Sequence, residues 1–341
     1  MGERKPILGI TMGDPAGVGP EIIAMALAER EVREACRALV VGDAATMAAA
    51  VEIVGSPLRV RAVQVPAEVQ DEPEVIHVLD LGNVDLGRLV RGRVDPMAGR
   101  AAYESVARAV DLALAGEVKA IVTAPLNKEA LHAAGYSFAG HTEILAHLCQ
   151  VQDVAMMLVS GGLRVSHVST HVSLREACDR VKKERVLRVI LLTDEALRRM
   201  GIAVPRIAVA GLNPHASDGG LFGHEEAEEI APAVQEAQAR GLQVEGPLPP
   251  DTVFYRAVKG HEIGRSPFDA VVAMYHDQGH IPIKLLGLFD GVNVTLGLPI
   301  IRTSVDHGTA FGKAGKGTAS PVSLIAAINL AVQMVRGSAG K

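Results

Sequence analysis

The chain has 341 residues, of which 48% are hydrophobic and 21% are charged, and this composition excludes an intrinsically disordered protein. The net charge of −5, with no Trp, four Tyr and six Phe, argues against a nucleic-acid partner, which needs clustered positive charge or aromatic stacking platforms. The three cysteines are odd in number and far apart, so we expect no disulfide framework and a cytoplasmic location. Because no run approaches the roughly 18 apolar residues of a membrane span and the chain opens without an apolar signal segment, we expect no membrane partner and no signal peptide.

Short apolar runs alternate with longer amphipathic runs along the chain. The short runs predict strands at Ile7–Thr11, Ala38–Val41, Val75–Leu79, Ala120–Thr123, Ala155–Ser160, Leu163–Val168, Arg206–Ala210, Ala270–Met274 and Val292–Thr295. The longer runs predict helices at Pro20–Ala28, Ala44–Val54, Ala98–Ala115, Thr142–Leu148, Val181–Met200, His224–Arg240 and Pro321–Val335. Strands that are nearly continuous in Val, Ile and Ala are typical of parallel sheets covered on both faces. The pattern therefore predicts an α/β fold with parallel strands.

Three of the predicted helices begin with recognisable residues. Pro20 suits a first helical turn, and Glu21 beside it suits the positive end of a helix. Asp95 can cap the next long helix if that helix begins at Pro96. Ser320-Pro321 opens the last predicted helix, again with a proline at its start.

The domain boundary is weakly marked, because the sequence contains no repeat, low-complexity tract or linker. Its length favours about two domains. We expect one crossing between domains near Thr123–Lys128 and a return near Gly297–Arg302. The expected domains are residues 1–125 with 300–341, and residues 126–299.

The first predicted strand is followed by the glycine-rich loop Gly13–Gly19, which opens a helix. Its glycine spacing differs from the G-x-G-x-x-G fingerprint, and no Lys-Ser/Thr pair follows as in a P-loop. The loop is either a tight turn that needs a positive φ or a segment that holds backbone close to a ligand. The sequence leaves both interpretations open.

Histidines occur at or near the ends of several predicted strands. His167 and His171 are four residues apart and would share one face of a strand, while His215 and His276 follow two later strands. Three imidazoles with one open position form a typical catalytic zinc site. Because the separations along the chain are long, separate structural roles for these histidines stay open.

Two further segments carry polar residues that suit an anionic ligand. Gly140–Glu143 opens a predicted helix, where Thr142 or His141 either caps the helix or binds a substrate at its positive end. Later in the chain, Lys284, Asn293 and Arg302 lie in or beside apolar stretches. Buried cations need partners, so these residues either bind a phosphate or carboxylate ligand or form salt bridges.

Residues 306–321 form a long glycine-rich stretch before the last predicted helix. Loops of this length are more often functional than not. Its glycines and Lys316 would suit a nucleotide, and a flexible connector is the alternative.

These segments resemble the 4-hydroxythreonine-4-phosphate dehydrogenase family (PdxA) of pyridoxal phosphate synthesis. The matching blocks, in order, are GITMGDPAGVGPEI, TAPLNKEAL, GHTEILA, GLNPHASDGG, PDTVF, AMYHDQGHIPIK and GVNVTLGLPIIRTSVDHGTAF. The resemblance runs from Gly9 to the last helix. The blocks HVSTHVSLREAC and YHDQGHIPIK look closer to the branch that acts on D-threonate or D-erythronate 4-phosphate.

The resemblance implies a fold like that of isocitrate and isopropylmalate dehydrogenases, with two α/β/α domains, a cleft between them and a homodimer with shared active sites. It implies one divalent metal (Zn, Mg, Mn or Co) bound by His171, His215 and His276, with His276 reaching the ion of the neighbouring subunit. His167 and His280 have no assigned role.

The resemblance also implies substrate and cofactor contacts. The implied substrate contacts are His141, Thr142, Lys284, Asn293 and Arg302. The loop with His307, Gly308, Gly315 and Lys316 would bind NAD or NADP. Related sequences often have an acidic and then an aliphatic residue where this chain has Gly312 and Lys313. Because an acidic side chain there could bind the ribose hydroxyls, its loss leaves the choice between NAD and NADP open.

The expected activity is metal-dependent oxidation, with decarboxylation, of a small phosphorylated four-carbon hydroxy acid, either 4-phosphooxy-threonine or D-threonate or D-erythronate 4-phosphate. Lys284 would bind an anionic end of the substrate, and Asp251 or Asp277 would accept the proton or support the metal ligands. The alternatives are a dehydrogenase for a cis-dihydrodiol carboxylate and a phospho-ligand-binding protein without catalysis.

Overall fold

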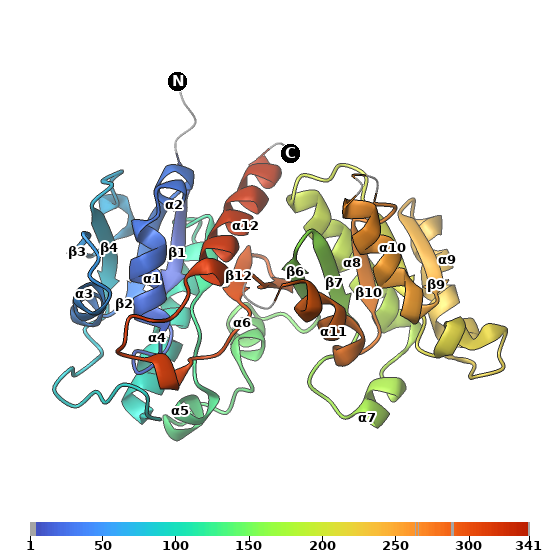
Figure 1. Cartoon of the computed structure of the whole chain (residues 1–341), viewed down its shortest axis with the longest axis horizontal. Helices are drawn as coiled ribbons and strands as arrows, with labels where there is room; N and C mark the ends of the chain where they lie inside the picture. Colours follow the sequence, from blue (N-terminus) through green and yellow to red (C-terminus); the bar gives the residue numbers. More distant parts are fainter. Residues whose placement is uncertain (1–4, 263, 265, 288–289, 340–341) are drawn as a thin grey trace. The chain divides into compact units, whose positions relative to one another are not determined.

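The computed structural model describes residues 5–262, 264, 266–287 and 290–339 (Figure 1). The chain divides into two compact units, Met1–Gln152 with Leu298–Val335 (unit 1) and Asp153–Gly297 with Arg336–Lys341 (unit 2). Residues 126–152, which the sequence pattern assigns to the second domain, cluster with unit 1. The helix that begins at Lys128 packs closely on the preceding long helix at Gly99, where a Cβ would collide with the Ala130 carbonyl oxygen.

Unit 1 contains a parallel sheet. Its strands are β1 (Ile7–Thr11), β2 (Arg37–Gly42), β3 (Arg59–Val63), β4 (Val75–Asp80), β5 (Ala120–Thr123) and β12 (Arg302–Val305). They lie in the order β3-β4-β2-β1-β5-β12. Each neighbouring pair runs parallel, as the sequence predicts.

The helices of unit 1 follow the strands in the expected alternation. They are α1 (Gly19–Ala28), α2 (Arg30–Ala35), α3 (Ala44–Ile53), α4 (Pro96–Leu114), α5 (Lys128–Ala133) and α6 (His141–Leu148), with α12 (Val322–Ala339) ending in unit 2 and short turns η1 (Pro66–Glu68) and η4 (Phe311–Lys313). The predicted cap of α4 is confirmed, because the Asp95 carboxylate accepts the Met97 N–H at 2.8 Å.

Unit 2 contains a mixed sheet rather than a wholly parallel one. Its strands are β6 (Ala155–Ser160), β7 (Leu163–His167), β8 (Arg206–Ala210), β9 (Gln243–Leu248), β10 (Ala270–Ala273) and β11 (Val292–Leu296), in the order β11-β6-β7-β10-β8-β9. Strand β6 is antiparallel to both β7 and β11. The reason lies in the chain path, because only Gly161 and Gly162 join β6 to β7 and so short a link allows no crossover.

The helices of unit 2 are mostly short. They are α7 (Leu174–Asp179), α8 (Lys183–Arg199), α9 (Ala231–Ala239), α10 (Pro250–Glu262) and α11 (His276–Leu286), with the turns η2 (Pro214–Asp218) and η3 (Glu226–Ile230). Within the described residues, no helix combines the length and the hydrophobicity that crossing a membrane requires.

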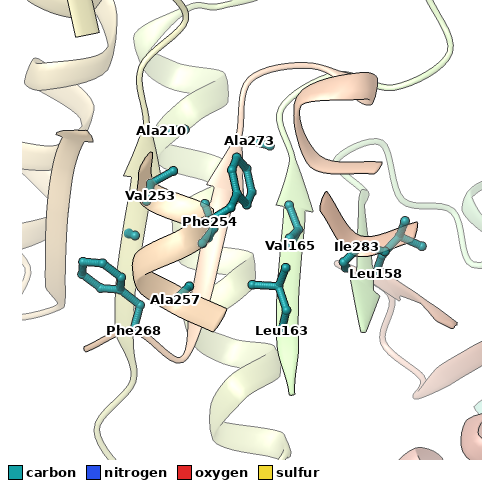
Figure 2. Packing of buried hydrophobic residues seen from close by; sticks show 12 residues of the cluster. Leu158, Leu163, Val165, Ala210, Val253, Phe254, Ala257, Phe268, Ala273 and Ile283 are labelled. Atoms are coloured by element: carbon teal, nitrogen blue, oxygen red, sulfur yellow. The ribbon is translucent and has the colours of Figure 1, made fainter. Parts of the chain in front are cut away.

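A tight apolar cluster holds α10 and α11 against the sheet of unit 2. Val253 and Phe254 of α10 lie near Val165 of β7, and Ile283 of α11 lies beside Leu158 of β6 (Figure 2). These side chains are at most 8% exposed. The packing fixes α11, and with it the histidines at the start of that helix.

Candidate active site

Three loops meet at the carboxyl ends of β1, β5 and β12 in unit 1. The Asp14 N–H donates to the Pro125 carbonyl at 2.9 Å, and the Val18 N–H donates to the Thr309 carbonyl at 3.0 Å. Gly13 has φ +72°, and a Cβ there would collide with the Pro125 carbonyl oxygen. The tight turn expected at the glycine-rich loop is therefore present, at a sheet edge where ligands of α/β proteins commonly bind.

Asp14 places a buried carboxyl group inside this loop. Its Oδ1 accepts the Ala16 N–H at 2.8 Å, and its Oδ2 has no hydrogen-bond partner among the described residues. Burial raises the pKa of Asp14 to about 6, the Ala16 N–H lowers it, and the nearby Asp95 adds to the rise. A buried carboxylate that lacks full hydrogen bonding destabilises the folded chain at neutral pH.

Replacing Asp14 by asparagine is therefore expected to stabilise the protein above pH 7. Because the pKa is higher in the folded state, the stability that this proton contributes is complete below about pH 4 and is lost as the pH rises to about 6. The expected gain at pH 7.5 is about 3 kcal/mol in the free energy of unfolding, and it shrinks toward pH 4. Urea unfolding across this range measures it.

The matched control is Asp43→Asn. Asp43 is 3% exposed, but its carboxylate accepts both the N–H and the hydroxyl of Thr46, so this change should destabilise the protein. A loss of stability for Asp14→Asn that does not vary with pH would contradict the prediction.

Arg302 is the buried cation of unit 1. It is 2% exposed, and its Nε and Nη2 donate to the Thr123 hydroxyl at 3.2 and 2.7 Å. The Ser304 hydroxyl donates to the Thr123 carbonyl at 3.1 Å and ties the same two strands together. Burial lowers the pKa of Arg302 to about 9, so the guanidinium stays charged at neutral pH.

His141 lies within the electrostatic reach of Arg302. It is the first residue of α6 rather than its cap, which is Gly140 and uses no side chain. The cap expected from His141 or Thr142 is therefore wrong, since both residues are already inside the helix. The His141 Nε2 is buried without a hydrogen-bond partner in the part of the chain described. Burial, followed by the charge of Arg302, lowers the pKa of His141 well below its usual range, so the imidazole is neutral at pH 7.

Four histidines of unit 2 form a contiguous group. The ring centroids of His276 and His280 are 3.6 Å apart and nearly parallel, those of His280 and His167 are 4.6 Å apart, and those of His276 and His171 are 5.9 Å apart. Strand β7 ends at His167. His167 and His171 therefore do not share a strand face as expected.

The two inner histidines are neutral. Burial, and then the neighbouring imidazoles, lower the pKa of His167 to about 3 and that of His280 to about 4. His280 also contacts the His276 backbone, because its Nδ1 lies 3.0 Å from that carbonyl oxygen. The sequence pattern indicates no role for either residue. Neither their spacing nor their surroundings in sequence predicts that they pack behind His276.

His215 is presented by a strained turn. His215, Ala216, Ser217 and Asp218 all have positive φ values, between +47° and +67°. Runs of this kind are costly for residues other than glycine and often occur at functional sites. The His215 Nδ1 lies 3.9 Å from Asp251 Oδ2, and both side chains are exposed.

A buried carboxylate organises the loop around His215. Glu226 is 3% exposed and accepts the backbone N–H groups of Leu212 and Asn213 at 2.8 and 2.7 Å. Gln278 joins this loop to α11, because its amide donates to the Gly211 carbonyl at 2.8 Å. Neither residue is predicted from the sequence, and only the acid-rich segment HEEAEE marks Glu226.

The metal ligands that the family resemblance implies are His171, His215 and His276. The ring centroids of His171 and His276 are 5.9 Å apart, and His276 Nδ1 lies 2.6 Å from Asp277 Oδ1. Across the described ranges of this chain, no three His, Cys, Asp or Glu side chains gather closely enough to hold an ion. A three-histidine site is thus not formed within one chain, and the implied site with His276 from a neighbouring subunit stays a prediction.

The remaining substrate candidates lie in different settings from those expected. Lys284 is exposed on α11, not embedded in an apolar strand, so the expectation of a buried cation at this position is wrong. Asn293 lies in β11, and its buried Oδ1 has no hydrogen-bond partner among the residues that the structure describes.

The buried carboxylate of Glu21 holds the candidate cofactor loop of unit 1 in place. Glu21 is 2% exposed, and its carboxylate accepts the N–H groups of Gly315 and Gly317 at 2.6 and 2.8 Å. His307 and Gly308 are exposed. A Cβ placed on Gly308 or Gly312 would meet nothing within 4 Å, so the space beside both residues is free for a ligand.

Comparison with known proteins relates these features to a family. The family described as "Pyridoxal phosphate biosynthetic protein PdxA" matches residues 34–331. The chain is 52% identical over 335 residues to D-threonate 4-phosphate dehydrogenase of Cupriavidus necator, covering 98% of both proteins. The structure of 4-hydroxythreonine-4-phosphate dehydrogenase from Klebsiella pneumoniae is similar, with a TM-score of 0.88 at 48% identity over 98% of this chain and 99% of that one. A terephthalate 1,2-cis-dihydrodiol dehydrogenase from Burkholderia xenovorans LB400 gives a TM-score of 0.69 at 32% identity over 97% of this chain and 98% of that one.

Proposed function

Because this chain belongs to the PdxA family and is a dehydrogenase that acts on a hydroxyl group, we propose that it oxidises D-threonate 4-phosphate. The relative named for that substrate shares 52% identity, against 32% for the cis-dihydrodiol dehydrogenase. D-erythronate 4-phosphate and 4-phosphooxy-threonine are the related substrates to be compared with it. A nicotinamide cofactor, NAD or NADP, would accept the hydride.

The paired setting of Arg302 and His141 is the observation that carries this proposal. A buried guanidinium with its orientation fixed by Thr123 suits a phosphate or carboxylate group. His141 is neutral beside it, so its Nε2 can exchange a hydrogen bond with the substrate without adding charge. Thr142, at the start of the same helix, would position a further polar group of the substrate.

Two further residues, Lys284 and Asn293, are substrate contacts that the family resemblance implies. Lys284 is exposed and bears a mobile ammonium group, which suits the second anionic end of the substrate. Asn293 has a buried amide oxygen without a partner in the described residues, and that oxygen would orient a substrate hydroxyl.

The proton of the oxidised alcohol needs an acceptor, and two carboxylates are suitable. Asp277 contacts His276 at 2.6 Å, and Asp251 lies 3.9 Å from His215. Each would remove the hydroxyl proton while hydride leaves the same carbon for the cofactor. Oxidation at the carbon β to the carboxylate gives a β-keto acid, whose loss of CO₂ leaves a three-carbon phosphorylated ketone.

We propose that a divalent metal is bound by residues of two copies of the chain. His171 and His215 of one copy, with the His276 equivalent of a second copy, would supply three imidazoles of the kind that bind Zn and other divalent ions. When bound, such an ion polarises an alcohol or carbonyl oxygen.

The homodimer is proposed on the surface of α11. Ile281 and Leu285 are 58% and 81% exposed on this helix, which begins with His276. A second copy packed on this face would remove both side chains from water. It would also bring the histidine of one copy toward the site of the other.

The test of the proposed function follows reduced nicotinamide at 340 nm. The purified protein receives a divalent metal, NAD⁺ or NADP⁺, and a panel of phosphorylated four-carbon hydroxy acids and their dephosphorylated forms. Turnover that depends on the phosphate supports the proposal. Turnover of a cis-dihydrodiol carboxylate alone would favour the alternative dehydrogenase, and binding without turnover would favour a phospho-ligand-binding protein.

A further inference from the structure

In the candidate cofactor loop of unit 1, side chains rather than backbone groups are available to distinguish one bound ligand from another. The N–H groups of Gly315 and Gly317 both donate to the buried Glu21 carboxylate, so neither is available to a bound phosphate. Because Glu21 lies in α1, these two hydrogen bonds also fix the position of the loop relative to that helix. What the loop presents to a ligand is therefore decided by the side chains between Phe311 and Lys316.

Those side chains are cationic. Lys313 and Lys316 are exposed, and the Lys316 ammonium donates to the Gly312 carbonyl at 2.7 Å, which places a positive charge beside the residue that lacks a side chain. The stem of Arg91 lies against Gly315, because a Cβ there would be 3.1 Å from Arg91 Cδ. Arg91 belongs to a neighbouring segment that is itself fixed, since the Gly92 N–H donates to the Ala16 carbonyl at 2.8 Å.

In the part of the chain that the structure describes, no acidic side chain forms an ion pair with this group. Lys313, Lys316 and Arg91 have no Asp or Glu oxygen within 4 Å among the residues that the structure describes. The open space beside Gly312 adjoins the Lys316 ammonium. Dinucleotide sites that select NAD use a carboxylate to bind the ribose 2′-hydroxyl, whereas sites that select NADP use a cation to bind the 2′-phosphate.

We propose that this loop selects NADP over NAD, with Lys313, Lys316 and Arg91 binding the 2′-phosphate of the adenosine ribose. The proposal rests on the proposed function for the presence of a nicotinamide cofactor, and it adds the choice between the two. Three cations around one dianionic group give charge-assisted hydrogen bonds that NAD cannot form. The alternative is that these lysines are only solvated and bind no ligand, and the experiment must distinguish the two cases.

Equilibrium binding tests the choice directly. Nicotinamide fluorescence titrations give Kd for NADPH and NADH, and calorimetry gives Kd for adenosine 2′,5′-bisphosphate and for 5′-AMP, which lacks the 2′-phosphate. We expect NADPH to bind at least about tenfold more tightly than NADH, with the difference shrinking at high salt. Lys313→Gln and Lys316→Gln should each reduce that ratio by about fivefold.

The chain offers a matched control and a reverse variant. Lys119→Gln removes the same charge from a lysine that also donates to a glycine carbonyl, that of Gly116, but lies before β5 at the other end of the strand, so the ratio should not change. Gly312 has room for a side chain and no left-handed φ, so Gly312→Asp with Lys313→Ile is tolerated by the backbone and should favour NADH.

The outcomes separate this inference from the proposed function. Equal or tighter binding of NADH, or an equal effect of Lys119→Gln, overturns the cofactor choice even if phosphorylated acids are oxidised with NAD⁺. Lysine-dependent preference for adenosine 2′,5′-bisphosphate over 5′-AMP upholds it even if no phosphorylated acid is a substrate, in which case the proposed function fails alone.

Discussion

Replacing Arg302 by methionine is expected to lower kcat/KM for D-threonate 4-phosphate by about a thousandfold, because the buried guanidinium would lose its charge-assisted bonds to the substrate. Methionine keeps much of the side-chain volume, and Arg302 is 2% exposed, so the fold should persist and thermal melting can verify it. The measurement is steady-state kinetics with the phosphorylated acid, in parallel with substrate titration. A kcat/KM within about threefold of the unmodified enzyme would remove Arg302 from the substrate site.

The orientation of Arg302 can be tested through Thr123. Thr123→Val removes the hydroxyl that accepts both guanidinium N–H groups, and it should raise KM by about tenfold, whereas Thr123→Ser should restore it. Thr303→Val is the matched control, because that equally buried hydroxyl donates to the Ala327 carbonyl instead. If Thr303→Val raises KM as much as Thr123→Val, the effect comes from a weakened sheet and not from the position of Arg302.

Strong hydrophobic runs gave the most reliable predictions of local structure. The strands Ile7–Thr11, Ala120–Thr123, Ala155–Ser160 and Arg206–Ala210 have the predicted bounds, because each is a short run of aliphatic residues between polar or turn residues. Strands β3, β9 and β12 were not predicted. β3 alternates arginine with valine and alanine on the edge of its sheet, and β9 contains Gly246 and Pro247, which normally argue against a strand.

Helix α11 shows why the candidate site was only partly predictable. Gly279 and Pro282 lie inside it, and both residues usually indicate a turn, so the segment was not predicted to be helical. Gly279 is required by packing, since a Cβ there would collide with the His167 ring. The helix turns Lys284 toward solvent and stacks His280 on His276, and neither follows from residue spacing. Contacts such as Glu21 with Gly315 join residues 294 positions apart and depend on the whole topology of unit 1.

The resemblance to a known family supplied what local patterns lacked, namely a prediction of which of the twelve histidines share a metal site. From spacing alone, a shared metal and separate structural roles stayed open. The structure adds a physical constraint, because within the described residues no three-donor group is formed in one chain. The proposed site, in which a second copy supplies His276, can be tested without seeing the ion.

Heterodimers that carry two different inactivating substitutions are expected to recover about half of the activity of the unmodified dimer if the site is shared. His215→Ala and His276→Ala should each lower kcat by about a thousandfold in homodimers, because each removes one proposed ligand from both sites. The heterodimer of these two variants is purified with two affinity tags after co-expression. In it, one site lacks both His215 and His276. The other site combines the intact His215 of one copy with the intact His276 of its partner.

The control pair is His215→Ala with His171→Ala. Both histidines are proposed to serve the site of their own copy, so every site of this heterodimer lacks one ligand and no activity should return. If the test pair does not recover activity, His276 acts within its own chain. If the control pair recovers activity, His171 and His215 do not serve the same site, and the proposed ligand set is wrong. The exposure of Ile281 and Leu285 on α11 would then need another explanation. The proposed dimer contact on this face depends on the shared site.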